Sequence, residues 1–88
     1  MIMTALNEKS QRISVDEFFA KHIEFSYNQK MVDQTTRILK MLLRHPYAVE
    51  ELSNKIGENY AFSVFGEKRT YTVVFTITTQ SIVLIDIW

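Results

Sequence analysis

The feature that most constrains the fold of this sequence is a change in the spacing of its apolar residues near Asn59. Before this point apolar side chains recur at intervals of three and four, and after it they recur at every second position. The first spacing is typical of one face of an α-helix and the second of a half-buried β-strand. The sequence therefore predicts helices first and a sheet at the carboxyl end.

Three apolar runs make up the predicted sheet. They are rich in threonine, valine, isoleucine and aromatic residues, which suit a pleated surface, and they cover residues 60–65, 71–78 and 81–87. The short connections at 66–69 and 79–80 are typical of hairpin turns, so the strands should be antiparallel neighbours in a β-meander. The last run continues almost to Trp88, as expected of a strand that lies inside the sheet or beneath a helix.

A first helix is predicted to begin at Ser14. Ser14 and Glu17 have the spacing of a capping box, in which each side chain satisfies a free backbone amide at the helix start. Helical spacing then continues to about Phe25. The segment 2–6 is compatible with a first strand or with a frayed end, so the sequence leaves its structure open.

A second helix is predicted from a broad apolar stripe between Met31 and Leu43. Pro46 disfavours helical geometry in the residue before it, so this helix should end near Arg44. A short helical turn should follow and end before Gly57.

These elements predict a single α+β domain over residues 1–88. Two N-terminal helices should pack on one face of a small antiparallel β-meander, because no other element is available to cover that face. A chain of this length holds one modest core.

Composition limits the function. Ten basic and ten acidic side chains cancel, whereas a dedicated nucleic-acid binder usually has a net basic surface. The absence of cysteine excludes disulfides and thiolate metal ligands and favours a cytoplasmic location. The two histidines are far apart, so we expect no metal site and no cofactor. No apolar run reaches the roughly 18 residues of a membrane helix.

The stretch from Ile38 to Trp88 resembles the RelE/ParE superfamily of bacterial toxins, including its HigB branch. The helix end LLRHP, the segment EELSNKIGENYAFSVFGEKRTYTVVFTI and the closing run SIVLIDIW are similar to the family's helix exit, first two meander strands and last strand. The resemblance implies a helical pair on an antiparallel sheet. It also implies a toxin of a bacterial toxin–antitoxin system, which either cuts mRNA on the ribosome or inhibits DNA gyrase.

The ribosome-dependent members of this family use basic, aromatic and His residues on the concave sheet face. Cleavage by a 2′-hydroxyl needs a base, an acid and cations around the developing charge. Most of the family's catalytic positions are not matched in this sequence, and the best available candidates for an mRNA endoribonuclease are Lys68, Arg69, Tyr71 and His45. A solvated hairpin tip and a solvated helix end are the alternative interpretations of these positions.

Four further residues are candidates for binding. Arg37, Lys40 and Arg44 lie at intervals of three and four, so they share one helix face that could meet RNA or an acidic protein. A solvated face is the alternative. Trp88 is either a core side chain or an anchor in a protein interface.

Two functions are compatible with these observations. The first is a toxin that a cognate antitoxin neutralises, with RNA or the ribosome as a further partner. The second is a non-catalytic immunity or inhibitor protein that binds and neutralises a cognate toxin. The neutral charge and the lack of basic residues in 60–65, where the family usually has them, favour the second function. The resemblance extends over many residues and favours the first, so a toxin is the function expected from the sequence and the inhibitor is the alternative.

Overall fold

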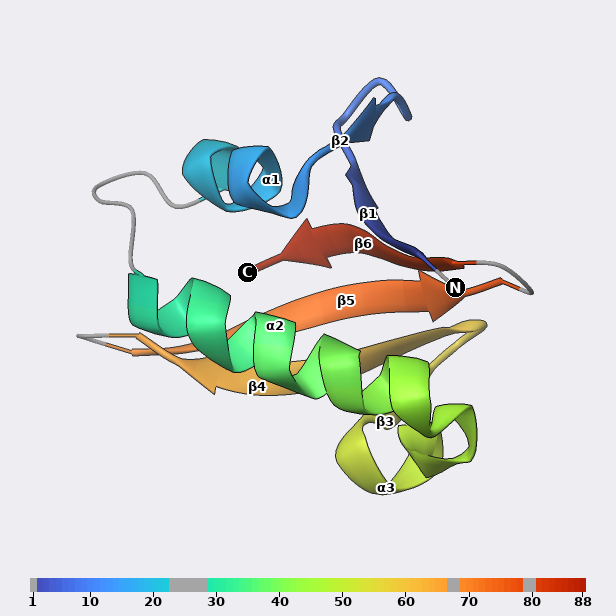
Figure 1. Ribbon diagram of the computed structural model, residues 1–88. Coiled ribbons are helices and arrows are strands. Elements are labelled where there is room, and N and C mark those ends of the chain that lie inside the picture. The colour runs from blue at the N-terminus through green and yellow to red at the C-terminus, as the bar shows by residue number, and fades with distance from the viewer. Residues whose placement is uncertain (1, 23–28, 67–68, 79–80) are drawn as a thin grey trace.

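The structure is a computed structural model that describes residues 2–22, 29–66, 69–78 and 81–88. In chain order its elements are β1 (Ile2–Leu6), β2 (Arg12–Ile13), α1 (Val15–His22), α2 (Gln29–Arg44), the 3-10 helix η1 (Pro46–Ala48), α3 (Val49–Leu52), β3 (Asn54–Ile56), β4 (Asn59–Phe65), β5 (Thr70–Ile77) and β6 (Ser81–Ile87). Helices and strands together form the α+β fold in Figure 1.

The strands form one six-stranded sheet in the order β2-β1-β6-β5-β4-β3. Strands β4, β5 and β6 are antiparallel neighbours, which confirms the predicted meander. Strand β1 lies beside β6 and runs parallel to it, with Thr4 opposite Val83. The sheet is therefore mixed.

Two parts of the predicted arrangement are wrong. The helices are not the first elements, because β1 and β2 precede them, and the sheet is not a purely antiparallel meander. The physical reason is the exposed edge that β6 would otherwise have. Strand β1 pairs with that edge and buries Ala5 completely in the core.

The position of β6 explains its apolar sequence. It has β1 on one side and β5 on the other, and Ser81 through Leu84 are buried on both faces. Strands that are buried on both faces read as continuous apolar runs. A β-bulge opposite Val74 and Phe75 follows, after which Asp86 is exposed and Ile87 returns to the core.

The predicted short helical turn is present as η1 and α3, but α3 ends at Leu52. The chain then forms β3, which pairs with the start of β4 through a tight turn at Gly57 and Glu58. Gly57 has a φ of +60°, as at the first central position of a type II′ turn. The glycine therefore belongs to a hairpin and does not mark the helix end.

Helix α1 begins where it was predicted to begin, and helix α2 ends where it was predicted to end. The Ser14 hydroxyl accepts a hydrogen bond from the Glu17 amide at 3.1 Å, as in a capping box, and α1 is described to His22. Its predicted end at Phe25 lies outside the described residues. Helix α2 ends at Arg44, before the proline.

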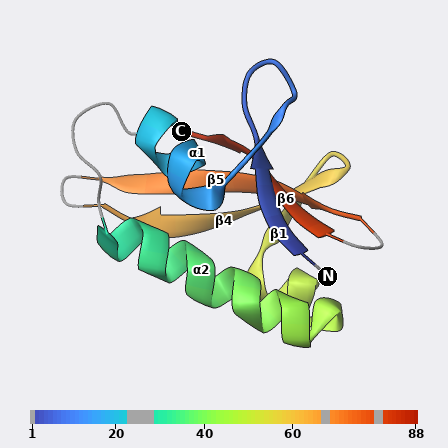
Figure 2. The same ribbon diagram turned by 45° about the horizontal axis from the view of Figure 1, so that its top comes forward.

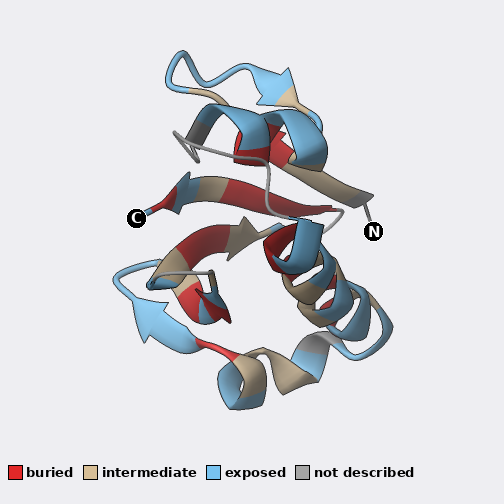
Figure 3. Ribbon diagram, turned by 90° about the vertical axis from the view of Figure 1, so that its left-hand side faces the viewer, coloured by how far each residue is buried: buried red, intermediate tan, exposed pale blue. Residues whose placement is uncertain are grey.

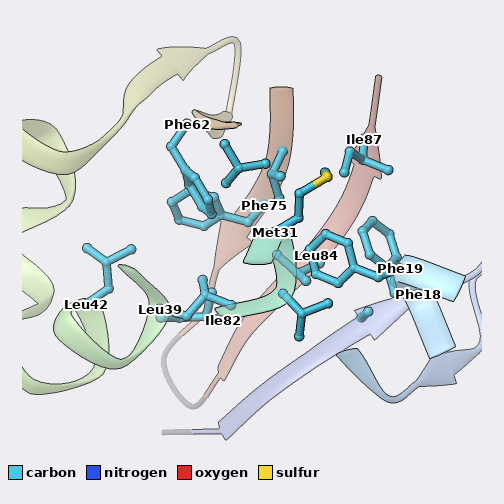
Figure 4. Close-up of a cluster of buried hydrophobic side chains, with 14 residues drawn as sticks. Phe18, Phe19, Met31, Leu39, Leu42, Phe62, Phe75, Ile82, Leu84 and Ile87 are labelled. Atoms are coloured by element: carbon cyan, nitrogen blue, oxygen red, sulfur yellow. The ribbon is translucent and has the colours of Figure 1, made fainter. Parts of the chain in front are cut away.

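The hydrophobic core lies between α1, α2 and one face of the sheet (Figure 4). Phe18 and Phe19 from α1 and Leu39 and Leu42 from α2 are fully buried there. At its centre, the ring of Phe75 lies 5.8 Å from Tyr60 and 5.5 Å from Phe62. The outward side of α2 is exposed (Figure 3).

Helix α2 runs along the sheet from the end that holds the β4–β5 hairpin to the opposite end (Figures 1 and 2). Gln34, in its first half, fixes this placement. Its amide nitrogen donates to the Phe65 carbonyl at 3.0 Å, and its oxygen accepts from the Phe65 amide at 3.0 Å. The side chain thereby supplies the two hydrogen bonds that a neighbouring strand would give to the edge of β4.

One buried hydroxyl in α2 generates a prediction about stability. Thr35 is fully buried, and its Oγ1 has no hydrogen-bond partner. Valine has the same shape without the hydroxyl, so Thr35→Val should raise the free energy of unfolding by about 1–2 kcal/mol. Urea unfolding measures the change, and Thr36→Val at the half-buried neighbour should stay within about 0.5 kcal/mol of the wild type. A loss of stability in Thr35→Val would mean that the hydroxyl has a partner in solution.

Candidate functional site

The predicted basic residues of α2 do share one exposed surface. Arg37, Lys40 and Arg44 are all exposed, and at 1.5 Å rise per residue they cover about 10 Å of the helix. The helix has four basic residues and one acidic residue, a net charge of +3. The acidic residue, Asp33, accepts a hydrogen bond of 2.9 Å from the side-chain amide nitrogen of Gln29.

An apolar side chain interrupts this surface. Met41 is 45% exposed, and it lies four residues after Arg37 and three before Arg44. Residues at these intervals are neighbours on a helix surface. We call Arg37, Lys40, Met41 and Arg44 together the basic face of α2.

Two of the four candidate catalytic residues are in contact. The guanidinium carbon of Arg69 lies 4.1 Å from the centroid of the Tyr71 ring, which is a cation–π arrangement. Gly66 packs directly against this pair, because a Cβ there would lie 2.7 Å from the Tyr71 ring and 2.9 Å from the Arg69 carbonyl oxygen. Lys68 lies outside the described residues.

His45 belongs to a different part of the molecule. Its Nδ1 lies 3.0 Å from the hydroxyl of Tyr47, and the two rings are 5.6 Å apart in an edge-on arrangement. Both side chains are exposed, Tyr47 to 80%. The pair lies just after the carboxyl end of α2.

The length of α2 separates His45 from Arg69 and Tyr71. Gln34 contacts β4 at the hairpin end, and Arg44 lies about 15 Å further along the helix axis. The structure thus brings Arg69 and Tyr71 together and places His45 at the other end of α2. In this arrangement no single phosphate can contact the histidine and the arginine at once.

Trp88 lies on the opposite side of the molecule from the basic face. Its backbone extends β6 through two hydrogen bonds with Thr72, of 2.7 and 3.0 Å. Residues opposite each other on paired strands share a face, and Thr72 alternates with the core residues Tyr71 and Val73. Trp88 therefore projects from the sheet face that α1 and α2 do not cover. It is 54% exposed, so it is not a core side chain.

The sheet face that α1 and α2 do not cover, here called the uncovered sheet face, has few ionisable side chains. Strand alternation places Ala61, Ser63, Thr72, Val74, Thr76 and Val83 on it. Although neither long helix covers them, Ala61, Val74 and Val83 are buried. Phe65 is exposed on the same face to 70%. The charged strand residues on this face, in the part of the chain that the structure describes, are Arg12 and Asp86. Histidine and lysine are absent from it within the same described strands.

Sequence reasoning missed two residues that shape these surfaces. Gln34 pairs with Phe65 over a separation of 31 positions, and no local pattern signals such a contact. Tyr47 follows Pro46 directly, so a turn that exposes its ring next to His45 was foreseeable from the sequence. The spacing of Arg37, Lys40 and Arg44 did predict correctly that these three residues share one exposed helix face.

Comparisons with known proteins found no relative of this chain. No family model, no curated protein and no solved structure matches the chain. Within the described residues, no helix is long and apolar enough to cross a membrane, and no three His, Asp or Glu side chains are grouped as metal ligands.

The packing of Gly66 predicts how the Arg69–Tyr71 pair responds to substitution. Gly66→Ala should push the Tyr71 ring out from beneath the guanidinium, since the added methyl overlaps both the ring and a backbone oxygen. Free energy of unfolding should fall by about 1–3 kcal/mol. The Arg69 side-chain protons should lose their upfield ring-current shift in NMR spectra. Gly57→Ala is the control for the NMR shift. It also lowers stability, because Gly57 has a φ of +60° that alanine adopts with strain, but its Cβ meets nothing within 4 Å and it should leave the Arg69 protons unchanged.

Proposed function

We propose that this chain is a non-catalytic binding protein that neutralises a cognate toxin, in the manner of an immunity protein or inhibitor. One observation carries the proposal. The candidate acid–base residue, His45, and the Arg69–Tyr71 pair lie at opposite ends of α2. General acid–base catalysis needs groups within hydrogen-bond reach of the same reacting atoms. A surface for binding a protein needs no such convergence.

The uncovered sheet face supports the same proposal. The RelE/ParE-like interpretation implies basic and histidine side chains on the concave face of the sheet. Among the described strand residues of that face, threonine, serine, valine and alanine predominate, and the exposed large apolar side chains are Ile56, Phe65 and Trp88. Exposed aromatic residues are typical of protein interfaces.

A RelE/ParE-like toxin is the second candidate function. Arg69 is the observation that favours it, because its guanidinium is exposed and held over the Tyr71 ring. An arginine fixed in this way can contact a phosphate on RNA. Under this interpretation the chain would cut mRNA or act on gyrase, and an antitoxin would cover it.

Expression in bacteria tests the two functions against each other. Induced expression of this chain alone should leave growth unchanged, and co-expression with the toxin encoded by a neighbouring gene should restore the growth that this toxin arrests. Colony counts and growth curves measure both effects.

Growth arrest by this chain alone would contradict the proposal. Arrest that Arg69→Ala abolishes, and that Lys55→Ala at another exposed basic position does not, would support the toxin in its place. Unchanged arrest in Arg69→Ala would exclude that arginine from the toxic site.

A further inference from the structure

The basic face of α2 gives the proposed binding function a specific surface and partner. Resting on that function, we propose that this face docks an acidic amphipathic helix of a partner protein. Arg37, Lys40 and Arg44 are exposed along one side of a helix with net charge +3, and Met41 is 45% exposed among them. The complementary surface has carboxylates around one apolar side chain.

The geometry of the face fits a helix. Its charges follow intervals of three and four residues, over about 10 Å, on a straight element that no other described element covers. A second helix that packs alongside at 8–10 Å repeats its own side chains at the same intervals. Glutamates spaced in this way can therefore meet all three basic side chains at once, which fixes the register of the two helices.

The surroundings of the face favour a protein partner over RNA. An RNA backbone is a continuous polyanion, and the acidic side chain of Asp33 lies four residues before Arg37. Exposed Glu50 and Glu51 follow in α3, so negative charge bounds the basic face on both sides. The whole chain has no net charge to attract nucleic acid. Met41 contributes an apolar contact that a phosphate cannot use.

A synthetic peptide tests this proposal. The probe is a capped helical peptide of about 21 residues that presents three glutamates at the spacing of the basic face around one leucine. A scrambled peptide of the same composition is its control. Isothermal titration of the full chain at about 50 mM salt should show binding of the patterned peptide and at least tenfold weaker binding of the scrambled one.

Three variants locate the contact. Arg37→Glu, Lys40→Glu and Arg44→Glu combined should weaken binding at least tenfold. The matched control combines Lys9→Glu, Arg12→Glu and Lys55→Glu, which changes the net charge equally at exposed positions elsewhere and should keep most of the affinity. Met41→Lys should weaken binding although it adds a positive charge. Thermal unfolding of each variant establishes that it is folded.

Several outcomes would overturn the proposal. Equal loss in the control combination would mean that attraction follows net charge alone. Tighter peptide binding by Met41→Lys would mean that charge alone attracts the peptide and that Met41 makes no apolar contact. Tighter binding of a single-stranded RNA oligonucleotide than of the peptide would assign the face to nucleic acid. These results are distinct from the growth test. Protection in cells without peptide binding would preserve the neutralising function and place its surface elsewhere, and growth arrest would overturn that function whatever the peptide does.

Discussion

The arrangement of the whole molecule depends on the pairing of β6 with both β1 and β5. An edge strand with the apolar sequence of β6 would offer a row of unpaired backbone groups to other chains. The parallel pairing with β1 removes that edge, and it joins the first strand of the chain to its last. With β6 fixed inside the sheet, Leu84 and Ile87 form the surface on which α1 packs its phenylalanines.

The sequence predicted the elements better than it predicted their partners. Alternation over 60–65, 71–78 and 81–87 and the stripe along α2 are local patterns, and they led to correct elements. The pairing of β1 with β6 joins segments almost 80 positions apart, for which the local pattern holds no information. Strand β3 has three residues, too few for alternation to be visible.

The same limit applies to the candidate site. Exposure of Arg37, Lys40 and Arg44 follows from helix periodicity alone, so these residues were placed correctly on one face. The choice of His45 and Arg69 as candidates for one catalytic site had no such basis, since local spacing does not indicate how far apart residues on different elements lie. Helix α2 acts as a spacer of fixed length between them. The hydrogen bonds of Gln34 with Phe65 fix the start of that helix at the hairpin end of the sheet, and they join residues 31 positions apart.

The charges of α2 are not needed to hold the fold. The inward side of the helix buries Met31, Val32, Leu39 and Leu42, and solvent-exposed charges contribute little to stability. A stable helix of this kind requires only that its outward face be polar, and a mixture of acidic and basic residues satisfies that requirement with less repulsion. Helix α2 instead carries like charges at neighbouring positions, in a chain whose total charge is zero. Arg44 lies in the last turn and interacts favourably with the helix dipole, but Arg37 and Lys40 have no such role in folding. The acidic partner proposed above would give their placement a reason that folding does not.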